Sequence, residues 1–121
     1  MTDNAKKIAE LNDRFRRASG DEPDGYRLGK KMVTRGIHAL GPLTQLLITA
    51  KVMAFDSFTP DNDPHGEHDF GSFELHGHKF FWKIDYYDRA SFGTGHDWGS
   101  EDPADPEKTL RVLTIMLAEE Y

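Results

Sequence analysis

The residues best suited to chemistry lie in one short acidic segment, Asp56–Asp69. Proline and glycine recur along it and disfavour a helix. Carboxylates packed this densely repel one another unless water, a cation or a basic partner compensates the charge. The segment is therefore the first candidate for a functional site. Its polar side chains are Asp61, Asp63, His65, Glu67, His68 and Asp69.

Metal binding is one chemistry that these residue types allow. The run from Asp61 to Gly66 partly follows a calcium-binding loop, with glycine at the sharp turn, but Ser72 stands where that loop needs a bidentate acid. The segment therefore fails as an EF-hand. A looser divalent site stays open, as does a turn-rich loop whose side chains bond their own backbone. The metal ligands would be Asp61, Asp63, His65 and His68, completed by Asp85, Asp88 or His96.

Acid–base catalysis has weaker support. Asp85 and Asp88 bracket two tyrosines, and His96 and Asp97 follow in a later loop. A hydrolase or transferase also needs a nucleophile and an anion-stabilising donor within reach. The serines occur in no nucleophile elbow, and no triad spacing emerges. We assign no catalytic residue and expect Asp85 to pair with Lys83 or Lys79 on a strand.

The formal net charge of −6 is unevenly distributed. Residues 1–54 carry +4, residues 55–105 carry −9 and residues 106–121 carry −1. Phosphate contacts need positive charge, so the acidic half is not expected to bind nucleic acid directly. A basic protein surface suits it better, as does mimicry of nucleic-acid charge. The candidate binding residues are Asp61, Asp63, Glu67, Asp69, Tyr87 and Trp98, although these aromatic side chains could instead complete the core.

Length and composition set further bounds. A chain of 121 residues is expected to form a single domain, residues 1–121. The absence of cysteine excludes disulfides, thiolate catalysis and zinc–thiolate sites. No apolar run approaches the length of a membrane span, and the N-terminal residues lack the apolar core of a signal peptide. We expect a cytoplasmic protein.

Apolar periodicity predicts the elements. A helix is expected from Asp3 or Asn4 to about Ser19, a strand over 31–35, and a well-buried helix that begins near Pro42. Runs 70–75 and 79–87 alternate with a two-residue period around a short connection that contains glycine, which predicts a hairpin. Asp105-Pro106-Glu107 predicts the start of a last helix, to about residue 119.

These elements predict an α+β fold in the order α-β-α-β-β-α. A small antiparallel sheet with a central hairpin would pack against three helices. On the second hairpin strand, alternate side chains should face the core, and the intervening ones should face outward. The expected core residues are Phe80, Trp82, Ile84 and Tyr86.

Three segments resemble a small bacterial family known as a domain of unknown function: FTPDNDPHGEHDFGSFEL, FFWKIDYYD and GSEDPADPEKTLRVLTIMLAEEY. The segment KKIAELNDRFRR also fits. Members of that family are short single-domain proteins, many encoded on plasmids and other mobile elements. The resemblance carries no established activity, cofactor or catalytic residue. Residues 93–98 look inserted relative to the family, so nothing about His96 or Asp97 is carried over.

The sequence therefore favours a non-enzymatic, acidic interaction protein that binds a basic protein surface. The family's setting implies an anti-defence or plasmid-associated role. The alternative is a metal-dependent enzyme that uses the Asp61–Asp69 loop and a divalent cation as its cofactor. A third possibility is a structural subunit whose aromatic face is covered in an oligomer. Patterns in the sequence leave the oligomeric state open.

Overall fold

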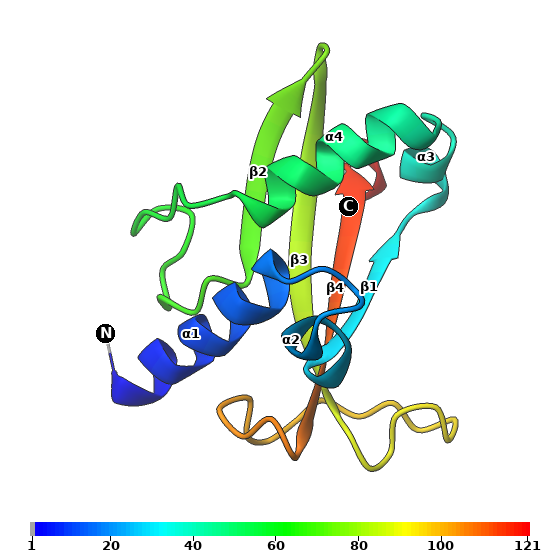
Figure 1. The fold of residues 1–121 in the computed structure, drawn as a ribbon. Coiled ribbons are helices and arrows are strands. Elements are labelled where there is room, and N and C mark those ends of the chain that lie inside the picture. Colours follow the sequence, from blue (N-terminus) through cyan, green and yellow to red (C-terminus); the bar gives the residue numbers. More distant parts are fainter. Residues whose placement is uncertain (1) are drawn as a thin grey trace.

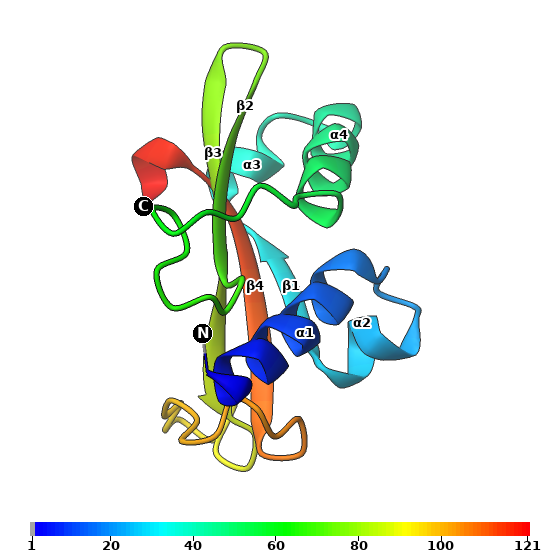
Figure 2. The same cartoon turned by 90° about the vertical axis from the view of Figure 1, so that its left-hand side faces the viewer.

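A four-stranded mixed sheet with helices on one face forms the body of the α+β fold in the computed structural model, which describes residues 2–121 (Figures 1 and 2). The strand order is β1-β4-β3-β2. β1 runs parallel to β4, and the other two pairs are antiparallel. The strands are β1 (Gly29–Val33), β2 (Phe70–Leu75), β3 (His78–Asp88) and β4 (Thr109–Leu117).

Two substantial helices, α1 (Asp3–Arg17) and α4 (Pro42–Met53), cross the same face of the sheet. Thr2 caps α1 by accepting a hydrogen bond from the Ala5 amide, so the cap lies one residue before Asp3 and two before Asn4, the expected positions. Pro42 occupies the first turn of α4, as predicted. The shorter elements are α2 (Pro23–Arg27), α3 (Arg35–His38) and the 3-10 turn η1 (Ala118–Glu120).

The predicted hairpin is confirmed as β2 and β3. Its turn is His76-Gly77, where both residues have positive φ, as a type I′ turn requires. Phe80, Trp82 and Ile84 are buried beneath the helices, as their two-residue period predicts. The outward face of β3 includes the ion pair that we expected between Lys83 Nζ and Asp85, at 2.9 Å.

The prediction of a helix from Asp105 to about residue 119 is wrong. Residues Thr109–Leu117 form the strand β4, and Asp105-Pro106-Glu107 belongs to a turn, in which Asp105 Oδ1 accepts from the Glu107 amide. β4 lies between β1 and β3, and its residues are buried on both faces of the sheet. A strand with two buried faces is apolar at nearly every position, which is also the pattern of a buried helix.

The prediction of a small antiparallel sheet with a central hairpin is also incomplete. The observed sheet has four strands and one parallel pair, and the hairpin lies at one side because β4 and β3 are the interior strands. The strand expected over residues 31–35 is β1, which spans Gly29–Val33 and pairs with β4 instead of the hairpin. Once residues 109–117 form a strand, β1 gains a partner on the side away from the hairpin.

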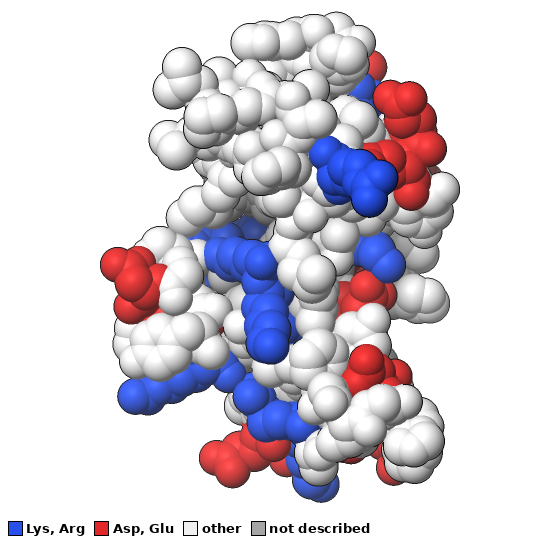
Figure 3. Space-filling model, turned by 90° about the vertical axis from the view of Figure 1, so that its right-hand side faces the viewer, with Lys and Arg blue, Asp and Glu red and all other residues white. Residues whose placement is uncertain are grey.

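Helix α4 is not well buried, contrary to the prediction. Ile48 and Val52 pack into the core, but Leu43, Leu46 and Leu47 are 81%, 71% and 50% exposed. Figure 3 shows a broad uncharged area in the upper part of the molecule, where α4 lies. The apolar face of the helix is wider than the side that the sheet covers, so several leucines stay exposed.

Among residues 2–121, no helix is both long enough and apolar enough to cross a membrane.

Candidate functional site

The acidic segment between α4 and β2 directs several of its carboxylates inward. Asp63 is buried, and its carboxylate accepts hydrogen bonds from the backbone amides of Glu67, at 3.1 Å, and His68, at 3.3 Å. These bonds shape the loop around Gly66, which has a positive φ of 69°. Asp63 therefore serves the loop's own backbone, as in an Asx turn.

Glu67 and Asp69 converge on a tyrosine of the sheet. The Tyr86 hydroxyl lies 3.3 Å from Glu67 Oε1 and 3.4 Å from Asp69 Oδ2. Burial, and then the charge of Asp69, raises the pKa of Glu67. Burial, and then the charge of Asp63, raises the pKa of Asp69. Burial and the nearby Asp69 also raise the pKa of Tyr86, which stays protonated and able to donate.

A buried amide joins this tyrosine to a buried arginine. Asn12 Nδ2 donates to the Tyr86 hydroxyl at 2.8 Å and to the Glu67 carbonyl at 2.9 Å, and Asn12 Oδ1 accepts from Arg111 Nε at 2.6 Å. Arg111 Nη2 donates to the Pro103 carbonyl at 2.6 Å. Burial lowers the pKa of Arg111 to about 10. The network links α1, the acidic segment and two strands.

His68 lies between two carboxylates at the surface of this network. Its Nδ1 is 3.0 Å from both oxygens of Asp13, and its Nε2 is 3.7 Å from Asp63 Oδ2. Its ring stacks on Phe58 with centroids 3.9 Å apart. Asp13 also accepts from the buried Arg16 Nη1 at 2.8 Å. Carboxylate–imidazole pairs serve as general bases, but among residues 2–121 neither ring nitrogen of His68 has a hydroxyl within hydrogen-bond distance.

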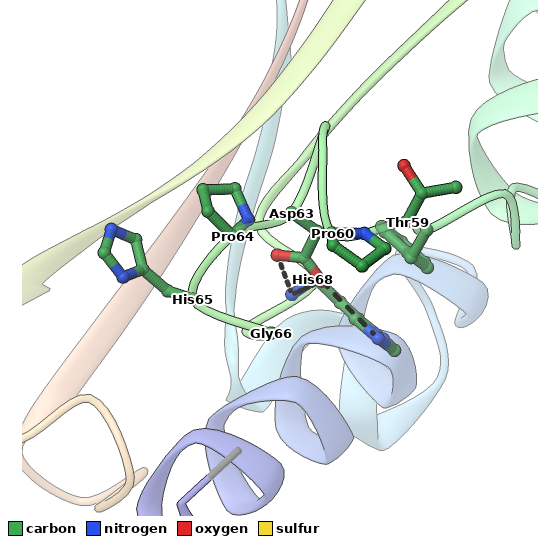
Figure 4. A pocket seen from close by; sticks show the side chains of 8 residues that line it. Thr59, Pro60, Asp63, Pro64, His65, Gly66 and His68 are labelled. Carbon is green, nitrogen blue, oxygen red and sulfur yellow. Dashed lines mark hydrogen bonds and ion pairs between the residues drawn. The ribbon is translucent and has the colours of Figure 1, made fainter.

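A shallow pocket of about 280 Å³ opens beside His68 (Figure 4). His68 and Asp63 line it side by side, whereas His65 points away from both. Asp61 is exposed. Among residues 2–121, no group of three or more His, Cys, Asp or Glu side chains is placed to hold a metal ion. The structure thus does not bring Asp61, Asp63, His65 and His68 together as one ligand set.

The two aromatic candidates lie at the last residues of β3, directly after Tyr86 in the case of Tyr87 and bonded to Asp88 in the case of Trp98. Trp98 is 66% exposed, and its carbonyl accepts from the Asp88 amide at 2.7 Å. Tyr87 is half-buried and packs edge-on against Phe92, with centroids 5.3 Å apart. Trp98 is therefore free to contact a partner, whereas Tyr87 mainly supports the loop that carries it. His96 lies beside Trp98, with ring centroids 5.7 Å apart.

The exposed face of α4 is a candidate surface that sequence reasoning missed. A groove of about 610 Å³ runs along it between the last turn of α3 and the end of α4. No acidic residue occurs in Pro42–Met53, and Lys51 is its one charged residue. The signal was the unusually wide apolar face of the helix, which we interpreted as burial. The groove is lined by His38, Pro42, Gln45, Leu46, Thr49, Ala50 and Met53.

Comparison with known proteins gives one match. The model of a family described as "Protein of unknown function (DUF3768)" matches residues 33–120, from the end of β1 to the end of η1. No curated protein and no solved structure gave a match. The matched region contains α4, the acidic segment and three of the four strands, and it leaves out α1. This chain therefore belongs to the family of proteins of unknown function DUF3768.

Proposed function

We propose that this protein acts by binding another protein and that the exposed face of α4 provides the contact. The observation that supports the proposal is the exposure of Leu43, Leu46 and Leu47 on one side of a single helix. Single exposed leucines are ordinary on protein surfaces, but a contiguous apolar patch is typical of an interaction site. Interior residues of the same helix, such as Ile48, already anchor it to the core.

The total accessible surface supports a covered face. The chain exposes 7420 Å², whereas a compact monomer of 13.8 kDa is expected to expose about 6,600 Å². The excess of roughly 800 Å² equals the area that one partner contributes to an interface of standard size. The projecting hairpin (Figure 1) and the exposed leucines of α4 both add to this accessible surface.

The occupant we propose is an amphipathic helix with a leucine-rich stripe and acidic flanks. The groove on α4 runs along the helix axis, and the leucine positions follow the i, i+3, i+4 spacing that a second helix would fill. Charge complementarity favours acidic residues on the flanks of the partner helix. α4 carries Lys51 and no acid, and Arg35 and His38 of α3 lie near its first turn. An acidic helix meets no like charge on α4 itself.

This contact differs from the acidic loop that we expected to bind a basic surface. Asp63, Glu67 and Asp69 point inward and bond within the chain, so a partner would meet little of their charge. An anti-defence or plasmid-associated role, which the family resemblance implied, remains part of the proposal. The partner would then be a host protein that presents such a helix.

The test uses a synthetic amphipathic peptide with leucines on one face and glutamates on its flanks. Fluorescence anisotropy of the labelled peptide should report saturable binding to the wild-type protein. Leu46→Glu should weaken binding roughly tenfold or more, because a buried leucine contributes about 1.5–3 kcal/mol. Met32→Glu is the matched control, since Met32 is also exposed but lies on β1. It should bind like the wild type.

Two results would overturn the proposal. One is peptide binding that Leu46→Glu and Met32→Glu weaken equally. The other is a wild-type protein that sediments as a dimer and a Leu46→Glu variant that sediments as a monomer, because a second copy would then cover α4. Circular dichroism of each variant checks that its fold is retained, as expected for substitutions at exposed positions.

A further inference from the structure

A cluster of cations follows the free edge of β1 and the loops next to its first residue. Figure 3 shows Lys and Arg side chains in a band through the middle and lower part of this face. Arg89 Nη2 donates to the Arg27 carbonyl at 2.8 Å, and the Arg89 amide donates to the Lys108 carbonyl at 2.9 Å. Lys30 follows on β1 itself. We call Arg27, Lys30, Arg89 and Lys108 the basic edge.

The charges of the basic edge are not neutralised within the chain. Across residues 2–121, carboxylates pair with Arg14, Arg16, His68 and Lys83, but none pairs with a residue of the basic edge. Glu107 borders the same surface without forming an ion pair. Arg27 and Arg89 line one pocket, so an anion that bound between them would be attracted by both, although Glu107 also borders that pocket.

One of these cations is held rigidly. Arg89 donates from Nε to the Pro106 carbonyl at 3.2 Å, and from Nη2 to the carbonyls of Arg27 and Thr109 at 2.8 and 3.0 Å. The guanidinium is thus fixed by backbone carbonyls and not by a carboxylate. A cavity of about 300 Å³ lies between Arg27 and Arg89, large enough for a phosphate group.

An exposed aromatic ring adjoins the same cations. Tyr26 is 54% exposed, and the Arg27 guanidinium lies over its ring, 5.7 Å from the centroid. Lys30 Nζ lies 5.3 Å from the ring centroid of Phe92. Cations that follow a strand edge, together with an accessible ring, are the features that bind single-stranded nucleic acid, because the cations contact the backbone and a ring stacks on an unpaired base.

We propose that the basic edge binds the phosphate backbone of single-stranded nucleic acid and that Tyr26 stacks on a base. Three of the five residues lie in the N-terminal part of the chain, residues 1–54, which carries +4. The acidic segment follows α4 and precedes β2, at the opposite edge of the sheet (Figure 1). Screening within about 10 Å at moderate salt separates the two regions.

The test measures the anisotropy of a fluorescently labelled 20-nucleotide oligothymidylate in about 50 mM salt, where phosphate contacts are strong. The double variant Arg27→Glu/Lys30→Glu should weaken binding at least tenfold. Tyr26→Ala should weaken it roughly tenfold. If three or four phosphates are contacted, the logarithm of the association constant should fall against the logarithm of salt with a slope of about −2 to −3.

Lys6→Glu/Lys7→Glu is the matched control. It makes the same change in net charge at two exposed positions of α1. It should bind far better than the basic-edge variant. The proposal fails if both double variants lose affinity equally, if the wild type does not bind the oligonucleotide, or if duplex DNA of the same length or polyglutamate binds as tightly. Leu46→Glu should leave oligonucleotide binding unchanged, which separates this test from that of α4.

Discussion

At the scale of single residues, Asn12 connects three parts of the chain that are distant in sequence. Its amide contacts Arg111 on β4, Tyr86 on β3 and the carbonyl of Glu67 in the acidic segment. All the polar atoms of this amide are thereby used in bonds within the interior. A buried arginine is costly without such partners, and Arg111 Nη1 already lacks one among residues 2–121.

Asn12→Ala should therefore destabilise the fold strongly. Arg111 Nε would lose its acceptor while buried, and we expect the free energy of unfolding to fall by about 2–4 kcal/mol. Chemical denaturation measures the loss. Asn62→Ala is the control, because Asn62 is exposed and bonds locally to Ser57 and Thr59. It should cost less than about 1 kcal/mol. Equal losses would contradict the assigned role of Asn12.

The raised pKa of Asp69 should make the stability of the fold depend on pH. Burial raises its pKa in the folded protein, so the folded state binds more protons than the unfolded chain at pH values between the two pKa values. The free energy of unfolding therefore falls as the pH rises from about 4, the unfolded value, through the folded pKa of Asp69. Asp69→Asn cannot ionise and avoids this loss.

The melting temperature of Asp69→Asn should accordingly exceed that of the wild type at pH 7. The difference should shrink as the pH approaches 4, where Asp69 itself becomes protonated. Asp61→Asn removes the same charge from an exposed position and should change the melting temperature little at either pH. An Asp69→Asn protein less stable than the wild type at pH 7 would show that the carboxylate is needed in its ionised form.

The sequence was enough to identify the candidate residues of the acidic segment. It did not show that their carboxylates bond within the chain instead of facing solvent. Spacing identified Asp63, Glu67 and Asp69 as a cluster, and composition indicated charge for a partner. They bond to the segment's own amides and to Tyr86. In the sequence, β2 and most of β3 lie between Asp69 and Tyr86. Long-range contacts of this kind, including the pairing of Asn12 with Arg111, have no local signature.

At the scale of elements, residues 109–117 show that apolar periodicity cannot distinguish a buried strand from a buried helix. LRVLTIML is apolar at nearly every position, and Asp-Pro-Glu before it is typical of a helix start. A buried interior strand gives the same run of apolar residues, and Val112, Thr114 and Ile115 are β-branched residues that favour it. The hairpin was predictable because its faces differ, and an alternating pattern fixes both strand and register.

Within the hairpin, Gly71 makes room for the largest core side chain. A Cβ at this position would lie 2.3 Å from Trp82 Nε1 and 2.6 Å from Cε2 of the same ring. Gly71→Ala should destabilise the fold by about 1–3 kcal/mol, because Trp82 is fully buried and cannot move aside freely. Denaturant unfolding checks this value.

The matched control for that substitution is Gly20→Ala. A Cβ at Gly20 would have no heavy atom within 4 Å, so the fold should tolerate alanine there with little change or a slight gain in stability. If Gly71→Ala and Gly20→Ala unfolded at the same denaturant concentration, Trp82 would not pack against β2 as closely as described above.

At the scale of the whole molecule, the two halves of the chain depend on each other. The family region begins at residue 33 and leaves out α1 and most of β1. Yet α1 places Leu11 and Phe15 in the core. Arg16, also on α1, donates to the carbonyls of Val52 and Phe55 at the end of α4, at 3.0 and 2.7 Å. We infer that residues 33–120 need α1 and β1 in order to fold.

A chain truncated to residues 33–121 should therefore lose its cooperative thermal transition and its near-ultraviolet circular dichroism. Without α1 the core is uncovered, Arg111 loses Asn12, and β4 loses its parallel partner β1. Adding a synthetic peptide of residues 1–33 should restore both signals in proportion to its concentration, because binding stabilises the folded state by mass action. A truncated chain that melts cooperatively by itself would place the stabilising core within the sheet and α4 alone.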